Sequence, residues 1–466
     1  MPQAVLRYGL DNGATAGTMR SVSLRQSVAA EAPERKRPEM NKMEQTRHTR
    51  TKWAVFTAAT LGYGLFYVCR LSLNVVKKPI VDAGYLTETE LGIIGSALFF
   101  SYAIGKFVNG FLADRVNVRY LMAGGLLVAA LVNFILGFAV PFWAFVILWA
   151  VNGWAQSVGG PCSVIALNRW FDSRQRGTVY GFWSASHNIG EAVTFIVTSF
   201  VVGWLGWQWG FMSAACLGAV GVALIFAFLK PSPEGYAPAA ESVADGKGSS
   251  VNGRQLEVLK TPMIWALALA SGFMYISRYA VNSWGVYYFA ADKGYDLVSA
   301  GSLISVSSVF GIVGTVFSGL ISDKFFNSDR NLPACLFSLL NLVSLALFLF
   351  GPSGCHTLDV VAMVLFGISV GVLICFLGGL MAVDIAPEGA TGAALGIIGV
   401  SSYMAAGLQD IVSGFLIESR KTVIDGVTVY DFSAMRLFWL GAACMSLLLL
   451  LLILVAARRK RKTQSL

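Results

Sequence analysis

Long apolar segments recur along this chain and restrict the folds that it can adopt. Each is long enough, at about 20 residues, to cross the hydrocarbon core of a bilayer as a helix. Only 13% of the residues are charged, whereas a soluble chain carries about a quarter charged residues. The segments lie at 53–76, 91–112, 118–138, 142–166, 178–204, 208–229, 262–290, 298–321, 332–351, 358–383, 391–417 and 434–457. The sequence therefore predicts an all-α membrane protein with twelve transmembrane helices.

The net charge of +9 comes mainly from Lys and Arg in the tails and connecting loops. Cytoplasmic loops of membrane proteins carry an excess of these residues, and here the basic loops alternate with loops that contain few Lys or Arg residues. The basic positions are Arg115, Arg119, Arg169, Arg174, Arg176, Lys230, Arg254, Lys260 and the run Arg458-Arg-Lys-Arg-Lys462. The pattern predicts a multi-pass protein of the cell (inner or plasma) membrane with both termini cytoplasmic, and gives no reason to expect nucleic acid as a partner.

Two matching motifs place charge inside apolar segments. They are Tyr67-Val-Cys-Arg70-Leu-Ser-Leu-Asn74 and Tyr275-Ile-Ser-Arg278-Tyr-Ala-Val-Asn282. Residues three and four apart share one face of a helix, so the tyrosine, arginine and asparagine of each motif point the same way. A charge at the centre of a spanning helix costs about 2.5 to 3.5 kcal/mol on insertion scales. We therefore expect the two faces to meet across an aqueous cavity, where both arginines bind one doubly charged anion.

A second pattern repeats at nearly the same spacing. The second segment ends in Gly105-Lys-Phe-Val-Asn-Gly110-Phe-Leu-Ala-Asp114-Arg115, and the eighth in Gly314-Thr-Val-Phe-Ser-Gly319-Leu-Ile-Ser-Asp323-Lys324. The offset is 209 residues, against 208 for the arginine motifs. Two patterns with a shared spacing indicate a duplicated six-helix unit. We expect the acid and base that end each copy to act as a structural latch at the helix ends.

Polar stretches divide the chain into five parts. We expect a disordered cytoplasmic tail at 1–50, a six-helix bundle at 51–230, a second bundle at 261–457 and a basic cytoplasmic tail at 458–466. Residues 231–260 include a Pro, Ala, Glu, Ser and Gly-rich stretch, typical of a flexible linker. Such a linker would let the two bundles rock as rigid bodies. A start of the natural chain at Met40 or Met43 stays open.

Five further polar residues interrupt apolar segments. Lys106 and His187 are basic and would add to an anion site, and Tyr63 lies seven residues before Arg70, near the same face. Glu191 follows His187 by four residues and shares its face. Lys106, Glu191 and Asp410 could instead form ion pairs with one another, and we expect Lys106 to pair with Asp410 across the interface between the bundles.

The arginines suit an anion, although a purely structural role is open. Their planar guanidinium groups give parallel hydrogen bonds to phosphate oxygens and stay charged. Ion pairs that only hold helices together would need two separate acids, one for each copy of the repeat. His187 could simply pack between helices, but its unperturbed pKa lies near the second pKa of a phosphate monoester. It could therefore respond to the protonation state of the substrate.

Nothing in the sequence indicates an enzyme, a metal or a cofactor. The seven cysteines show no Cys-x-x-Cys spacing, and the three histidines are far apart, so neither set predicts a metal site. No nucleophile and base pair, phosphate-binding P-loop or redox motif is present. We expect transport or binding rather than catalysis.

Several segments resemble a known family. Gly110-Phe-Leu-Ala-Asp-Arg-Val-Asn-Val-Arg119 resembles the loop motif of the major facilitator superfamily. Other segments are similar to its organophosphate:phosphate antiporter family, which includes glycerol phosphate and hexose phosphate transporters and a hexose phosphate sensor. They are Gly62-Tyr-Gly-Leu-Phe-Tyr-Val-Cys-Arg70, Ala103-Ile-Gly-Lys-Phe107, Gly153-Trp-Ala-Gln-Ser-Val-Gly-Gly-Pro161, Trp183-Ser-Ala-Ser-His-Asn-Ile-Gly190 and Tyr275-Ile-Ser-Arg-Tyr279. The resemblance implies two six-helix bundles related by a pseudo-twofold axis.

The resemblance also implies roles for individual residues. The family's two phosphate-binding arginines fall on Arg70 and Arg278. Its other pocket residues fall on Lys106, His187, Tyr63, Tyr67 and Tyr403. The motif residues Asn74, Tyr275 and Asn282 complete the candidate binding set.

This chain departs from the family at several positions. Leu71 replaces a basic residue that often follows the first arginine. Ser283 and Ser308 stand where the family has acids, and the family's Gly-Pro in the tenth helix is replaced by Val372-Leu-Ile374. Glu191 and Asp410 are additional acids. We expect the ion-pair network that controls rocking to be rewired.

The resulting functional prediction is a monomeric secondary transporter in the bilayer. It would exchange a sugar phosphate or glycerol phosphate for inorganic phosphate by alternating access, because closing an empty site would bury two unpaired arginines at a cost of several kcal/mol. One alternative is a membrane sensor of external hexose phosphate that signals to a membrane kinase with little or no transport. A facilitator for another dianion, such as a phosphonate or sulfonate, is a third reading.

Overall fold

The computed structural model describes residues 42–233, 258–326, 329–386, 391–425 and 427–464. The predicted tail before residue 42 and most of the predicted linker lie outside these residues, so the domain boundaries remain predictions. Residues 51–466 form one unit. The first described helix, α2 (Lys42–Asp82), begins well before the apolar segment does, because Lys, Met, Glu, Gln and Arg are good helix formers.

The first half of the chain contains six spans. Its elements are α2, α3 (Glu88–Arg115), α4 (Val118–Leu136), α5 (Phe142–Gln156), α6 (Gly159–Trp170), α7 (Ser173–Ser184), α8 (Ser186–Val193), the π-helical turn η1 (Thr194–Thr198), α9 (Ser199–Leu205) and α10 (Trp207–Phe228). The fourth span is broken between α5 and α6. Pro161 causes the break, since it cannot donate a hydrogen bond to the carbonyl of Ser157 and its ring clashes with that carbonyl.

The second half contains the other six spans and one hairpin. Its elements are α12 (Pro262–Ala291), α13 (Leu297–Phe325), α14 (Asn331–Phe350), α15 (His356–Cys375), η2 (Phe376–Leu380), α16 (Met381–Ile385), α17 (Thr391–Glu418), strands β1 (Lys421–Ile424) and β2 (Val427–Tyr430), and α18 (Ser433–Gln464). Among the described residues, eleven helices are long and apolar enough to cross a membrane. With the broken fourth span they make the twelve that were predicted.

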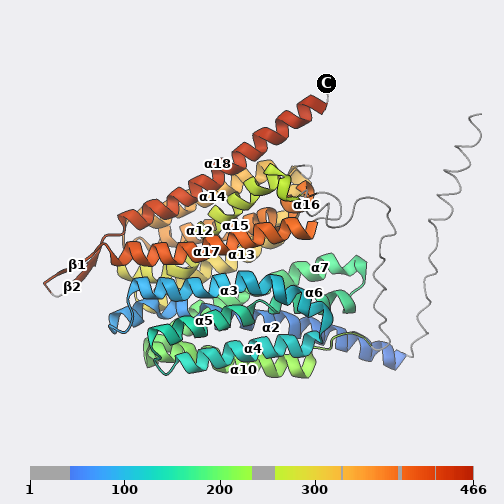
Figure 1. Ribbon diagram of the computed structural model, residues 1–466, viewed down its shortest axis with the longest axis horizontal. Helices are drawn as coiled ribbons and strands as arrows, with labels where there is room; N and C mark the ends of the chain where they lie inside the picture. Colours follow the sequence, from blue (N-terminus) through green and yellow to red (C-terminus); the bar gives the residue numbers. More distant parts are fainter. Residues whose placement is uncertain (1–41, 234–257, 327–328, 387–390, 426, 465–466) are drawn as a thin grey trace, which may run out of the picture. The chain divides into compact units, whose positions relative to one another are not determined.

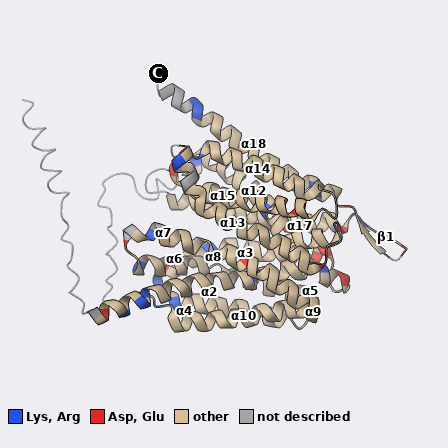
Figure 2. Ribbon diagram, turned by 180° about the vertical axis from the view of Figure 1, so that it is seen from behind, with Lys and Arg blue, Asp and Glu red and all other residues tan. Residues whose placement is uncertain are grey.

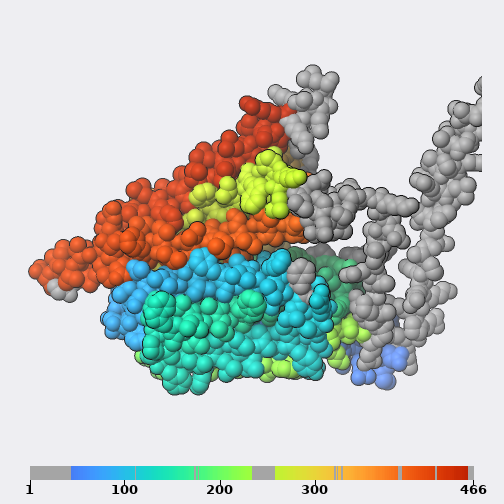
Figure 3. All heavy atoms as spheres, in the orientation of Figure 1, coloured from blue at the N-terminus to red at the C-terminus, as the bar shows by residue number. Residues whose placement is uncertain are grey.

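The two halves lie side by side as two helical bundles (Figure 1). Helix α3 of the first half packs along α17 of the second, and α8 packs against α13. Figure 3 shows atoms of α3 and α17 in contact along their crossing. The predicted all-α fold of two six-helix bundles is confirmed.

Glycines permit the close approach of α3 to α17. A Cβ atom on Gly95 would lie 2.0 Å from Oδ2 of Asp410, and one on Gly414 would lie 2.3 Å from the carbonyl oxygen of Glu88. Small residues at helix crossings let backbones approach in membrane proteins. These glycines were not singled out in the sequence, because only the crossing angle shows which glycines face the other bundle.

The ends of the bundles differ in charge. Figure 2 shows Lys and Arg gathered mainly at the helix ends away from the β1–β2 hairpin. They include Arg115, Arg119, Arg176, Lys324 and Arg330, which lie in the terminal turns of helices or directly beside a helix. This distribution is the one from which a cytoplasmic location was predicted. We refer to the two ends as the hairpin end and the basic end.

Candidate functional site

The two arginine motifs meet in the structure. Helix α2 carries one and α12 the other, and the side-chain amide of Asn74 donates to the backbone carbonyl of Asn282 at 3.1 Å. Both arginines are buried, with 4% of Arg70 and 6% of Arg278 exposed. The predicted meeting of the two faces is therefore present, and it brings together residues 208 positions apart.

Arg70 lies among aromatic rings and forms no ion pair with an acid of the described residues. Its guanidinium carbon is 4.2 Å from the ring centre of Tyr102, 5.5 Å from that of Tyr67 and 5.7 Å from that of Tyr403. Its Nε and Nη2 atoms are buried and make no hydrogen bond to any described residue. Ring faces attract a cation, but they leave the N–H groups unbonded. Buried donors without an acceptor are costly, so this side chain is suited to bind an acceptor that the protein itself does not provide.

Arg278, in contrast, has an acid of its own. Its Nη2 atom lies 2.9 Å from Oε1 of Glu191, which comes from α8 in the other half. The hydroxyl of Ser308 on α13 donates to Oε2 of Glu191 at 3.4 Å. The ion pair that was only an alternative for the arginines is thus present at one of them. The two arginines, symmetric in sequence, have different surroundings.

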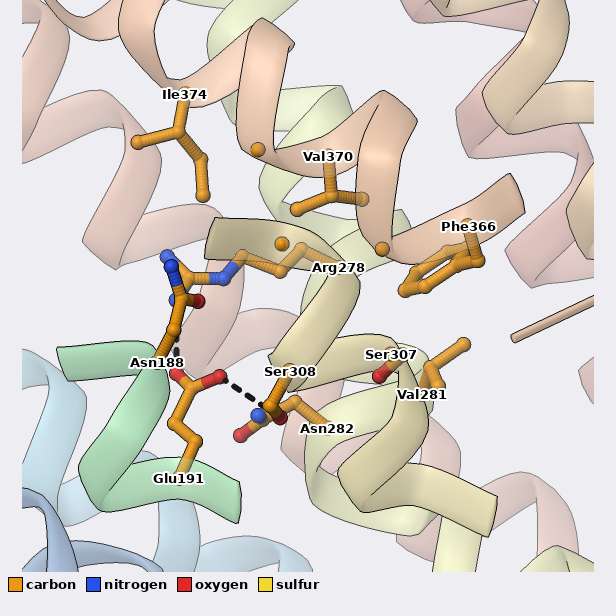
Figure 4. A pocket seen from close by; sticks show the side chains of 13 residues that line it. Asn188, Glu191, Arg278, Val281, Asn282, Ser307, Ser308, Phe366, Val370 and Ile374 are labelled. Atoms are coloured by element: carbon orange, nitrogen blue, oxygen red, sulfur yellow. Dashed lines mark hydrogen bonds and ion pairs between the residues drawn. The ribbon is translucent and has the colours of Figure 1, made fainter. Parts of the chain in front are cut away.

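A pocket of about 350 Å3, part of it open to solvent, lies beside this ion pair. Figure 4 shows Arg278 and Glu191 pointing toward each other at its wall, with Asn188 beside the guanidinium. Helices α12, α13 and α15 supply the other walls, which include Asn282, Ser308 and Phe366. Arg70 does not line this pocket. The predicted cavity shared by both arginines therefore stays a prediction.

Tyrosine side chains lie close to one another and to the two arginines. The rings of Tyr275 and Tyr403 are 5.6 Å apart, and those of Tyr63 and Tyr67 are 5.5 Å apart. Tyr403 interacts electrostatically with both Arg70 and Arg278. Four of the predicted pocket tyrosines thus lie around the arginines.

His187 lies within this cluster. Its ring centre is 5.6 Å from that of Tyr67, and its Nδ1 atom contacts the carbonyl oxygen of Ser184. A carbonyl can only accept, so Nδ1 carries the proton and a neutral ring leaves Nε2 as an acceptor. Both arginines act on this histidine electrostatically, which places it near the predicted anion site.

The predicted pair of Lys106 with Asp410 is wrong in this structure. Asp410 is buried and binds Lys77, with Oδ1 3.2 Å from the ammonium nitrogen. The same oxygen accepts from Ser283 at 2.6 Å and from the indole of Trp284 at 2.7 Å. Lys106 is exposed and lies 5.5 Å from the ring centre of Tyr403. Asp410 lies nearer the hairpin end than Lys106 does, where Lys77 of α2 faces it.

The two additional acids, Asp410 and Glu191, each lie beside one of the serines at which the resemblance implies an acid. Asp410 accepts from Ser283, and Glu191 accepts from Ser308. The predicted rewiring of the ion-pair network stays a prediction.

The latch motifs at the basic end show no such pairing. Asp114, Arg115 and Lys324 are exposed and form no ion pair with another described side chain. The side chain of Asp323 lies outside the described residues. The latch role therefore remains a prediction.

Three contributors to the site were missed in the sequence. Lys77 lies seven residues after Arg70 and three after Asn74, so helical spacing already put it on the motif face. Tyr102 precedes Lys106 by four residues, and Tyr279 directly follows Arg278. The guanidinium of Arg278 is 5.2 Å from the ring centre of Tyr279. Extending each motif by one helical turn would have found Lys77 and Tyr102.

Comparison with known proteins places these features in a family. The model of the Major Facilitator Superfamily matches residues 59–409. A membrane sensor protein, UhpC, of Salmonella typhimurium is 32% identical over 365 residues, which cover 75% of this chain and 81% of the sensor. A probable hexose phosphate transport protein of Chlamydia pneumoniae is 34% identical over 61% of this chain and 67% of its own length. The glycerol-3-phosphate transporter of Bacillus subtilis is 29% identical over 83% and 90%.

Solved structures show the same fold at low sequence identity. An inward-facing, occupied bacterial homolog of the human lysosomal transporter Spinster has a TM-score of 0.69 at 16% identity, covering 87% of this chain and 96% of that one. The nucleoside transporter NupG has a TM-score of 0.66 at 16% identity, covering 87% and 98%. The chain therefore belongs to the Major Facilitator Superfamily and, within it, to the family of organophosphate transporters and sensors that its motifs resemble.

Proposed function

We propose that this protein transports an organophosphate, either a sugar phosphate or glycerol phosphate, and exchanges it for inorganic phosphate by alternating access. The observation that carries the proposal is Arg70, which is 4% exposed and has two buried donor nitrogens, Nε and Nη2, without an acceptor among the described residues. A phosphate offers three acceptor oxygens and negative charge, and guanidinium groups bind such oxygens in parallel. Arg70 would bind the phosphate on one side and Arg278 on the other.

The surrounding residues fit this role. Tyr63, Tyr67, Tyr275 and Tyr403 supply hydroxyl groups beside the arginines, and the amides of Asn74 and Asn282 lie one helical turn beyond them. A sugar or glycerol moiety is recognised by such neutral donors and acceptors. Lys106 and His187 would add positive charge or follow the protonation of the substrate. The names of the relatives agree with this class of substrate and with a transporter rather than an enzyme.

Cross-bundle contacts support alternating access. The bundles are joined at the arginines and toward the hairpin end, by Asn74 with Asn282 and by Lys77 with Asp410. Breaking these contacts while new ones form at the basic end would expose the site to the other side. We propose that the basic end and both termini are cytoplasmic, and that the protein works as a monomer in the cell membrane. Trypsin accessibility of the tail at 458–466 in inside-out and right-side-out vesicles tests this orientation.

A sensor is the second candidate. The relative UhpC is named a membrane sensor protein, but relatives named as hexose phosphate transport proteins match at similar identity, so similarity does not favour signalling over transport. A sensor would bind hexose phosphate at the same arginines and act on a membrane kinase.

The decisive experiment is exchange in proteoliposomes preloaded with labelled inorganic phosphate. Glucose 6-phosphate, glycerol 3-phosphate, a phosphonate and sulfate are added outside in turn. We expect one organophosphate to release the label, and Arg70→Lys to reduce that release at least about tenfold, since the bidentate contact is lost. Arg420→Lys, at an exposed arginine of the hairpin end, is the matched control. If no compound releases the label but one of them raises the melting temperature, the site binds without transport and the sensor function is favoured.

A further inference from the structure

One carboxylate distinguishes the two halves of the proposed phosphate site. Arg278 is ion-paired to Glu191, whereas Arg70 forms no ion pair with any described residue. The group of Arg70, Arg278 and Glu191 therefore carries one net positive charge when no anion is bound, instead of the two that a pair of arginines alone would carry. The cost of burying this group without a ligand is correspondingly lower.

Glu191 binds Nη2 of Arg278, an atom that a phosphate would also bind. Its carboxylate comes from α8 of the first half, reaches across to α12 of the second half and lines the pocket together with Arg278 (Figure 4). Both side chains are almost fully buried, at 7% and 6% exposed. A carboxylate that holds a guanidinium in this way resembles a bound anion in charge and in the hydrogen bond it accepts. A phosphate that binds Nη2 of Arg278 must displace Glu191 from this atom.

The charged groups that face Glu191 come from three helices. Helix α12 provides Arg278 and the phenol of Tyr279, and α2 provides Arg70. On its own helix, His187 lies one turn earlier. Helix α13 contributes only the hydroxyl of Ser308, and α15 lines the pocket with Phe366, Val370 and other uncharged residues. When Arg278 binds a phosphate instead, Glu191 is left close to that phosphate's negative charge.

We propose that Glu191 is an internal counter-ion, which the organophosphate displaces from Arg278 and which takes up one proton from water as it leaves. This inference rests on the proposed function. A dianionic phosphate with two arginines and a neutral Glu191 has no net charge, so the loaded site can be buried. When the organophosphate is released, Glu191 loses its proton to water and returns to Arg278. The empty transporter can then close and reorient.

The consequence is a second mode of transport. An exchanger with two unpaired arginines must carry phosphate on its return, whereas this protein can also return empty. Organophosphate uptake is then coupled to one proton, and exchange for phosphate is no longer obligatory. Glu191→Gln removes the counter-ion and should leave a stricter exchanger.

Net uptake tests the coupling. Proteoliposomes without internal phosphate, alkaline inside, receive labelled organophosphate, and a parallel set with internal phosphate measures exchange. We expect the ratio of net uptake to exchange to fall at least about tenfold in Glu191→Gln, because one more unpaired charge must be buried in the empty state. Glu90→Gln is the matched control, since glutamine also serves at that helix-capping position. An unchanged ratio in Glu191→Gln overturns the inference.

Proton uptake on binding gives a second readout that does not require transport. At pH 8 a phosphate monoester is already a dianion, since its second pKa is about 6. Purified protein in weak buffer with a pH indicator should take up about one proton per bound organophosphate, and Glu191→Gln should take up none. Glu90→Gln, the matched control, should still take up the proton. Equal proton uptake by wild type and Glu191→Gln sinks the inference. If no variant exchanges phosphate for any organophosphate, the proposed function fails instead.

Discussion

At the scale of single residues, Arg70 and Arg278 should respond differently to the same substitution. Arg278→Gln leaves the buried carboxylate of Glu191 without its cation, and breaking a buried ion pair in this way costs about 3–5 kcal/mol. Arg70→Gln removes a buried charge that has no acid. We expect the first variant to lower the free energy of unfolding in detergent by about that amount, and the second to leave it unchanged or raise it.

The double variant Arg278→Gln with Glu191→Gln is the control for this prediction. It removes both charges, so most of the free energy of unfolding that Arg278→Gln loses should be restored. Equal destabilisation by Arg70→Gln and Arg278→Gln would show that the asymmetry seen here has no energetic consequence.

A second residue pair, Lys77 with Asp410, lends itself to a double-mutant cycle. Both side chains are buried, and Trp284 and Ser283 also bind the carboxylate. Neutralising either residue, as Lys77→Met or Asp410→Asn, should lower the melting temperature strongly, whereas the double variant should recover much of it. The cycle of Lys106→Met with Asp410→Asn should be additive, because these residues do not touch. Coupling in the second cycle but not in the first would contradict the pairing described here.

At the scale of elements, the β1–β2 hairpin ties the second bundle to the first. The strand register places Lys421 opposite Tyr430, and both bind the buried Glu88 at the start of α3, at 2.7 and 3.0 Å. Tyr287 of α12 donates to the same carboxylate at 2.8 Å. Burial raises the pKa of Tyr430 to about 12, so its hydroxyl stays protonated and donates at neutral pH. The hairpin therefore holds the two bundles together at the hairpin end.

Lys421→Met should weaken the attachment of the hairpin to Glu88. The variant keeps the length of the side chain but leaves Glu88 with only neutral donors, so we expect faster amide hydrogen exchange in residues 421–430, by about tenfold. Thr422→Val, the exposed neighbour whose side chain alternates to the other face, should leave the exchange rates close to wild type. Unchanged exchange in Lys421→Met would mean that the two tyrosine contacts suffice.

At the scale of the whole unit, the hairpin end is held closed by the glycine crossing of α3 with α17. A side chain at Gly95 would meet Oδ2 of Asp410, and overpacking of this kind costs about 1–3 kcal/mol. Gly95→Val should therefore shift the population toward a state open at the hairpin end. The distance between spin labels at Phe138→Cys and Ser353→Cys, one in each half, should increase in a background without the native cysteines.

Gly124→Val is the matched control for this experiment. No atom lies within 4 Å of a Cβ placed at Gly124, so the same substitution on α4 should leave the label distance unchanged. An identical response of the two variants would show that closure does not depend on the α3–α17 crossing.

The sequence by itself determined the number of spans, the two bundles and the meeting of the arginine motifs. These features follow from properties of single helices. The thickness of the bilayer sets the length of a span, and the helical period of 3.6 residues sets which side chains share a face. The spacing of 208 residues then made α2 and α12 counterparts, and Asn74 contacts Asn282 as expected. The position of Arg70 in a buried, aromatic site was also within reach of this reasoning.

Only the tertiary structure decided which charges pair. Asp410 binds Lys77 and not Lys106, and Glu191 binds one arginine of a symmetric pair. These partners come from helices far apart in the chain, and their contact depends on crossing angles and helix rotation. The contact of Gly95 with α17 and the contacts of the β1–β2 hairpin with α3 were likewise decided only by the tertiary structure. Periodicity identifies the face of a helix, but the packing of the two bundles selects the residue it meets.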